Sequence, residues 1–141
     1  ICANDHTQRY GGTWIDADMI AAYCDLHRAG FAHSIEAWQA DQLAGGLYGV
    51  SLGRCFFGES MFTRVSDASK VALVTLARRL QRWQFTLIDC QVSSAHLMRM
   101  GATEIPRQRF LRELSAALRH GHRSGKWKEH FDSSGGSPPP A

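Results

Sequence analysis

Hydrophobic and polar positions alternate with a period of two in three consecutive stretches of the chain, residues 33–39, 43–50 and 54–62. This period is typical of strands, and the short turns between the stretches predict an antiparallel meander. A fourth stretch, residues 86–92, is almost continuously apolar and predicts a short central strand. The glycines at residues 45–49 indicate a bulge or a close backbone approach.

Apolar residues at helical spacing predict four helices around these strands. Helix-starting side chains precede three of them, namely Asp16, Ser66 or Asp67, and Ser93 or Ser94. The order of the elements predicts a mixed α/β (α+β) domain, with a mostly antiparallel sheet flanked by helices. The predicted helices cover residues 16–29, 68–83, 94–100 and 107–119. The apolar positions of the second helix are Val71, Leu73, Val74, Leu76 and Leu80, and the predicted buried face of the fourth is Phe110, Leu111, Leu114 and Leu118.

The composition is typical of a soluble globular domain, with 44% hydrophobic and 21% charged residues in a chain of 141. No apolar run approaches the roughly 20 residues of a membrane span, and the first residues lack a signal-peptide pattern. The four cysteines form no CxxC pair, which favours reduced thiols in a cytoplasmic protein. The histidines and cysteines lack zinc-site spacing, so we expect no metal. The Ser/Gly/Pro-rich end predicts a disordered tail.

Positive charge is concentrated toward the C-terminal part of the chain. Residues 101–131 carry seven Lys and Arg residues against three Glu residues, whereas the whole chain has a net charge of only +3. Such a segment is typical either of a phosphate-binding patch or of a solvated helix face. The charge pattern alone does not separate the two interpretations.

Two of the predicted strands carry polar side chains among apolar ones. Glu59 lies in the middle of residues 56–62, and Asp89 and Gln91 lie within residues 87–91. Strand alternation places Asp89 and Gln91 on one face, where the carboxylate would fix the Gln91 amide NH2 and leave its carbonyl free to accept. If the two strands adjoin, all three side chains line one cleft. A buried polar network that fixes strand register is the alternative interpretation.

Two further candidates are weaker. Cys90, His96 and a carboxylate would make a thiol-hydrolase triad, but alternation points Cys90 away from Asp89, which argues against it. Trp14 follows a Gly-Gly turn, where an exposed indole would stack on a nucleobase, although the residue pattern favours a core anchor.

These segments together resemble the leucyl/phenylalanyl-tRNA–protein transferases. The resemblance runs in unbroken order over about residues 11–114. Its most specific motifs are Gly-Glu-Ser-Met-Phe at residues 58–62 and Asp-Cys-Gln at residues 89–91. The other matching segments are Gly12-Thr13-Trp14-Ile15, His33-Ser34-Ile35-Glu36-Ala37-Trp38, Gly45-Gly46-Leu47-Tyr48-Gly49-Val50, Ala68-Ser69-Lys70-Val71-Ala72-Leu73, His96-Leu97, Gly101-Ala102 and Ile105-Pro106-Arg107.

The resemblance implies a reaction and a fold. Family members move Leu or Phe, and Met less well, from an aminoacyl-tRNA to proteins with N-terminal Arg or Lys, which marks them for degradation. The implied catalytic domain is similar to the GNAT acyltransferases and spans residues 13–122. Residues 1–12 then correspond to the end of the family's N-terminal domain and linker, and residues 123–141 to a basic, then Ser/Gly/Pro-rich tail. The resemblance implies no cofactor and a cytoplasmic enzyme with no membrane partner; it leaves the oligomeric state open and favours a monomer.

The resemblance also implies roles for individual residues. Gln91 would accept a hydrogen bond or the proton from the acceptor α-amine, Asp89 would polarise and orient Gln91, and Glu59 would meet the acceptor Arg or Lys. Trp14 matches a position that stacks near the tRNA 3′-adenosine, which reverses the preference for a core anchor. The donor side-chain pocket would be formed by Leu47, Phe56, Met61, Leu76 and Ile88. Because Phe56 and Met61 differ in strand parity, a bulge or twist must bring both to the pocket.

Two alternatives stand beside this interpretation. One is an N-acetyltransferase of the same fold, which would need a Gly-rich pyrophosphate loop where the chain has Arg64-Val65-Ser66-Asp67. The other is an inactive remnant that binds RNA or peptide, because the chain begins near the end of the family's adenosine-binding N-terminal domain.

Overall fold

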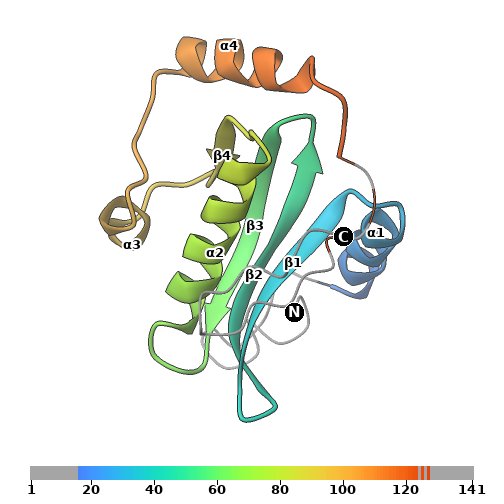
Figure 1. Ribbon diagram of the computed structural model, residues 1–141, viewed down its shortest axis with the longest axis vertical. Helices are drawn as coiled ribbons and strands as arrows, with labels where there is room; N and C mark the ends of the chain where they lie inside the picture. Colours follow the sequence, from blue (N-terminus) through green and yellow to red (C-terminus); the bar gives the residue numbers. More distant parts are fainter. Residues whose placement is uncertain (1–15, 124, 126, 128–141) are drawn as a thin grey trace.

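The described residues of the computed structural model are 16–123, Gly125 and Trp127. They form a mixed α/β fold in which helices flank a four-stranded sheet of order β1-β2-β3-β4 (Figure 1). The first three strands are antiparallel neighbours, and β4 runs parallel to β3. The meander and the four helices are thus confirmed. In chain order the elements are α1 (Ala17–Arg28), β1 (Ala32–Gln39), β2 (Gln42–Leu52), β3 (Cys55–Thr63), α2 (Ala68–Arg82), β4 (Leu87–Asp89), α3 (Ala95–Arg99) and α4 (Arg107–Leu118).

Local chemistry explains where the elements begin and turn. The Asp16 carboxylate accepts a hydrogen bond from the backbone N–H of Met19 at 2.8 Å and so caps α1, as predicted. Ser94 caps α3 in the same way through Leu97. Ala40 and Asp41 both have positive φ, which gives the two-residue turn whose twist suits a β-hairpin.

The core lies between α2 and one face of the sheet. Leu47 and Phe56 of the sheet meet a row on α2 spaced by four, Ala72, Leu76 and Leu80, and all five are buried. On the opposite face, Tyr48 packs edge-on against Tyr23 of α1, with ring centroids 5.1 Å apart. Alternation along β2 therefore directs neighbouring residues to different helices.

Two helices bury fewer of their apolar side chains than the sequence predicts. Val71 and Val74 are 58% and 38% exposed, because the row spaced by four turns these two positions of α2 away from the sheet. Leu111 and Leu118 of α4 are each 47% exposed, and Ala117 is the buried residue of this helix. The carbonyl of Ala117 accepts a hydrogen bond from the N–H of Arg54 at the β2–β3 turn. The C-terminal end of α4 is thus held against the body of the protein.

The fourth strand is shorter and more peripheral than predicted. It spans residues 87–89 rather than 86–92, and it forms an edge of the described sheet rather than its centre. The chain leaves β4 because Gln91 adopts a left-handed backbone conformation, with φ of +61°. None of the helices in the described part of the chain has the length and apolar character needed to cross a bilayer.

The chain beyond α4 returns to the core. Trp127 stacks on His33 of β1 with ring centroids 3.7 Å apart, and it packs against Phe56, Trp83 and Phe85. These contacts place Trp127, which follows the predicted domain of residues 13–122, against the core. The reason is the apolar area of the indole, which finds a matching aromatic cluster at the end of α2.

Burial of His33 makes the stability depend on pH. Its side chain is 3% exposed, and desolvation, reinforced by the nearby His27 and His122, lowers its pKa from 6.5 to about 4, although the nearby Gly30 backbone opposes this. Between these two values the unfolded chain binds a proton that the folded chain does not. The free energy of unfolding should therefore fall by about 1.4 kcal/mol per pH unit as the pH drops through this window.

Urea unfolding at a series of pH values from 7 to 4 measures this slope. The His33→Phe variant keeps a ring against Trp127 and should lose the His33 part of the slope. The exposed His120→Phe variant should keep it. Equal slopes in wild type and His33→Phe would contradict the assignment.

Candidate functional site

A β-bulge at Glu59 shapes the middle of β3. Tyr48 pairs with Ser60 and Gly49 pairs with Gly58, so Glu59 is the extra residue between two paired ones. The bulge shifts the alternation of β3 by one residue. Phe56 and Met61, which pair with Ser51 and Leu47, consequently reach the same face of the sheet. The predicted need for a bulge between these two residues is confirmed.

Gln91 is held in place by the bulge. Its amide nitrogen donates a hydrogen bond to the backbone carbonyl of Gly58 at 2.8 Å. Its backbone N–H donates to the Asp89 carboxylate, also at 2.8 Å. A left-handed conformation is uncommon for a side-chain-bearing residue, and strain of this kind concentrates at functional sites.

The role predicted for Asp89 needs one correction. Asp89 holds the backbone of Gln91, whereas the carbonyl of Gly58 fixes the amide NH2. The reason is the turn after β4, which brings the backbone N–H of Gln91 to the carboxylate and swings its side chain toward β3. Sequence reasoning missed Gly58 as a partner, because a main-chain carbonyl leaves no residue signature.

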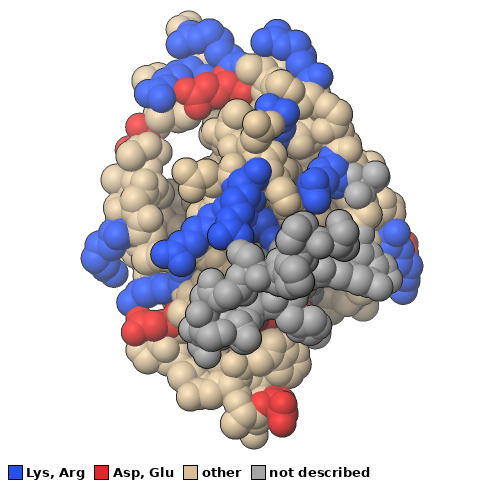
Figure 2. All heavy atoms as spheres, viewed as in Figure 1, with Lys and Arg blue, Asp and Glu red and all other residues tan. Residues whose placement is uncertain are grey.

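A cleft of about 990 Å³ opens beside β4 (Figure 2). Its walls come from Leu73 and Ala77 of α2, from residues 87–93, and from the arm that carries α3 and α4. Asp89 and Gln91 lie in its lining, but Glu59 does not. The prediction of one cleft for all three side chains is therefore correct for two of them, because the bulge places Glu59 apart from the cleft wall.

Glu59 remains close to Gln91 along the backbone of β3. It is half-buried, and it forms no hydrogen bond or ion pair with any residue in the described part of the chain. Its neighbour Gly58 carries the carbonyl that holds Gln91.

The structure brings together the five residues predicted for the donor pocket. Leu47, Phe56 and Leu76 are 4%, 1% and 1% exposed, and Met61 and Ile88 pack against them. Ile88 also lines the cleft, so the cluster and the cleft meet at β4. Trp14 lies outside the described residues.

The thiols near this site are poor nucleophiles. Burial, followed by the nearby Asp89 charge, raises the pKa of Cys90, and the same causes raise the pKa of Cys55 to about 12. A nucleophilic cysteine needs a lowered pKa, so these shifts disfavour the thiol-hydrolase interpretation. Within the described residues, no cluster of three or more His, Cys, Asp and Glu side chains is arranged to hold a metal ion.

Comparisons with known proteins place the chain in a family. A sequence model of the leucyl/phenylalanyl-tRNA protein transferase family matches residues 1–115. The chain belongs to this family. The matched residues include both partners of the Gly58–Gln91 hydrogen bond. We therefore interpret these residues by comparison with the transferase family.

Curated relatives with the same family name are similar over most of the chain. A leucyl/phenylalanyl-tRNA–protein transferase from Myxococcus xanthus is 60% identical over 118 residues, which are 84% of this chain and 50% of the relative. Relatives of the same name from Nitrosomonas europaea and Thiobacillus denitrificans are 57% and 58% identical over 86% of this chain, and these matches cover 50% and 53% of the relatives. The chain thus spans about half the length of these transferases.

Proposed function

We propose that this chain carries the acyl-transfer part of a leucyl/phenylalanyl-tRNA–protein transferase, on a domain of the GNAT type. The donor is Leu or Phe, and less readily Met, esterified to tRNA, and the acceptor is the α-amine of a protein that begins with Arg or Lys. The observation that carries the proposal is Gln91, which is held in a strained conformation between Asp89 and Gly58 at a cleft. The family of the chain supplies the reaction class.

The reaction needs orientation more than strong base catalysis. The neutral α-amine attacks the carbonyl carbon of the aminoacyl ester, a C–N bond forms, and the bond to the ribose oxygen breaks. The amine loses a proton and the ribose oxygen gains one. Because the ester is already activated, a fixed hydrogen-bond acceptor that aligns the amine supplies most of what is required. The Gln91 carbonyl has this role, since an amide is too weak a base to remove the proton alone.

The surrounding residues bind different parts of the two substrates. The donor Leu or Phe side chain is received where the cluster of Leu47, Phe56, Leu76, Met61 and Ile88 meets the cleft at β4. Glu59 binds the cationic side chain of the acceptor. Trp14 stacks near the 3′-adenosine of the tRNA. No cofactor takes part in this scheme.

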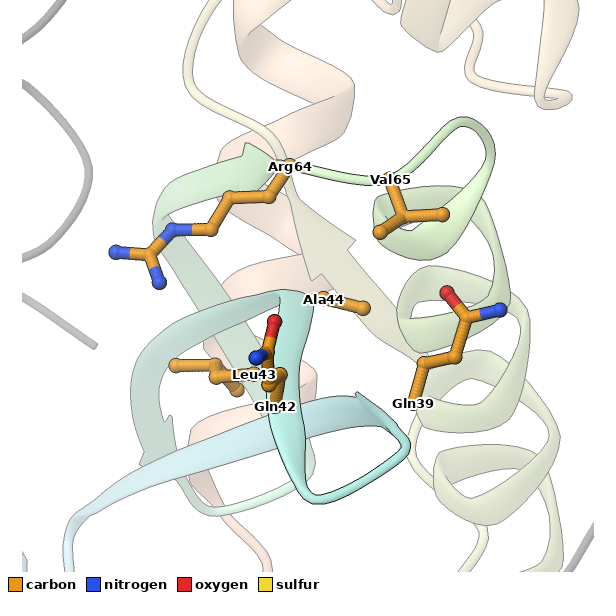
Figure 3. A pocket seen from close by; sticks show the side chains of 6 residues that line it. All are labelled: Gln39, Gln42, Leu43, Ala44, Arg64 and Val65. Carbon is orange, nitrogen blue, oxygen red and sulfur yellow. The ribbon is translucent and has the colours of Figure 1, made fainter.

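The loop between β3 and α2 argues against an acyl-CoA substrate. The backbone N–H groups of Arg64 and Val65 both donate to the carbonyl of Ala44, at 2.8 and 3.1 Å. The loop packs there beside a shallow hollow of about 260 Å³ (Figure 3), with Arg64 and Val65 extending to different sides. Backbone donors committed in this way do not cradle a pyrophosphate, which needs them free at the start of the helix.

The decisive assay follows labelled Leu from Leu-tRNA to a peptide that begins with Arg. Labelled peptide is expected, and a peptide that begins with Asp serves as the control acceptor. Acetyl-CoA is tested as a rival donor in parallel. Acetylation without transfer of Leu would overturn the proposal.

Changing Glu59 to Gln should weaken acceptor selection. The substitution keeps size and removes the charge that meets Arg or Lys, and a charge-assisted contact contributes about 1.5–3 kcal/mol. The KM for an Arg-starting peptide is therefore expected to rise about tenfold to a hundredfold, with kcat largely retained. The Glu104→Gln variant, an exposed carboxylate of the cleft lining, is the charge-matched control. An unchanged preference for Arg over uncharged N-termini in the Glu59 variant would refute this role.

A further inference from the structure

The outer face of α2 presents a continuous row of basic side chains. Lys70, Arg78 and Arg82 are exposed and belong to one row of positions spaced by four, which also contains Val74. No Asp or Glu occurs from residue 68 to residue 88. Figure 2 shows the resulting band of Lys and Arg along α2, on the same face as the opening below α4. Lys70, at the N-terminal end of the row, pairs with Asp67.

Trp83 gathers two further arginines at the C-terminal end of this row. The guanidinium of Arg79 lies 4.8 Å from the indole centroid, and that of Arg123 lies 4.1 Å from it. Arg79 is only 5% exposed. Burial lowers its pKa, and the neighbouring charges that act in the same direction are Arg123 and Arg82. The fold therefore gathers arginines around Trp83, and such a concentration of positive side chains favours the binding of a polyanion.

The position of the row suggests what that polyanion is. Leu73 and Ala77, on another side of the same helix, line the cleft that holds Gln91. A phosphate backbone that follows α2 would thus run beside the entrance to the proposed reaction centre. Guanidinium groups match phosphate oxygens in shape and charge, and an extended row fits a chain of phosphates better than a single anion.

We propose that Arg78, Arg82 and Arg123 form a surface that holds the backbone of the tRNA donor along α2. This inference rests on the proposed function, which makes an aminoacyl-tRNA the donor. The proposed surface differs from the basic segment of residues 101–131, because it takes only Arg123 from that segment and its other arginines from α2. Arg109 of α4 pairs with Glu113, whereas Arg123 joins a cluster built mainly by α2.

Binding of deacylated tRNA to the full chain tests the surface. Fluorescence anisotropy at about 50 to 200 mM KCl gives the affinity and its salt dependence. The Arg78→Gln/Arg82→Gln variant alters two exposed side chains and should fold normally. It is expected to bind tRNA about tenfold more weakly, with a salt slope smaller by about one for each arginine removed. The Arg28→Gln/Arg99→Gln variant, which loses the same charge at exposed sites on α1 and α3, should bind like wild type.

The possible results distinguish failure of the tRNA-binding surface from failure of the proposed transfer reaction. Unchanged tRNA affinity and salt slope in Arg78→Gln/Arg82→Gln would overturn the surface, even if the chain transfers Leu. Reduced slope in that variant, with no transfer to an Arg-starting peptide by wild type, would support the surface and reject the proposed function. Vesicles that contain phosphatidylserine test a membrane instead of RNA. Loss of vesicle binding in the variant, with tRNA binding unaffected, would also overturn the proposal.

Discussion

Replacing Gln91 with Ala is expected to lower kcat for transfer of Leu to an Arg-starting peptide by about a hundredfold or more. In the proposed reaction the Gln91 side chain supplies the acceptor that aligns the amine, and nothing in Ala replaces it. The folded state should change little, because Gln91 is exposed and the left-handed conformation strains Ala and Gln alike. Single-turnover transfer rates, together with urea unfolding, measure both quantities.

Gln84 offers a matched control for this substitution. It is also an exposed glutamine with positive φ, and its side chain accepts a hydrogen bond from Arg54 away from the cleft lining. Gln84→Ala should transfer Leu at the wild-type rate. The Gln91→Gly variant adds a second readout, since glycine relieves the strain and should make the protein about 1 kcal/mol more stable than Gln91→Ala. A Gln91→Ala enzyme with wild-type kcat would remove this residue from the mechanism.

Replacing Gly49 with Ala is expected to destabilise the fold by about 3 kcal/mol or more. A methyl group at this position would lie 2.1 Å from the carbonyl oxygen of Phe57 and 2.6 Å from the ring of Phe56. The oxygen belongs to the paired strand and cannot move without breaking the sheet beside the bulge. Urea or thermal unfolding measures the loss.

Gly58, the strand partner of Gly49, is the control for this prediction. Among the described residues, a methyl group there would meet only the Asp89 carbonyl oxygen, at an ordinary contact distance of 3.5 Å. Gly58→Ala should therefore change stability by less than about 1 kcal/mol. Equal losses in the two variants would show that the close approach at Gly49 is not what limits this part of the sheet.

The elements of the fold follow closely from local patterns. Alternation of period two gives β1, β2 and β3 to within about two residues, and Asp16 and Ser94 start their helices where their side chains suggest. Burial of individual helix positions is less predictable. Val71 and Val74 are apolar and lie outward, because residues spaced by four, such as Ala72 and Leu76, already fill the sheet face.

The candidate site was likewise predicted only in part from the sequence. The sequence identifies Asp89, Gln91 and Glu59 as polar residues in apolar strands, and family resemblance adds their roles. The hydrogen bonds of Gln91 depend on the parallel pairing of β3 with β4 and on the bulge at Glu59. The pairing of β3 with β4 and the bond from Gln91 to Gly58 join residues more than thirty positions apart, so spacing along the chain cannot specify them.

The sequence by itself determined the family, the α/β class and the polar residues of the candidate site, because these depend on residue types and on short-range periodicity. The tertiary structure alone decided that Gly58 fixes the Gln91 amide, that Trp127 closes the core against His33, and that Arg123 joins the basic row of α2. Each of these contacts joins segments that are distant in the chain. Their geometry follows from packing and strand register, which arise only when the whole domain has folded.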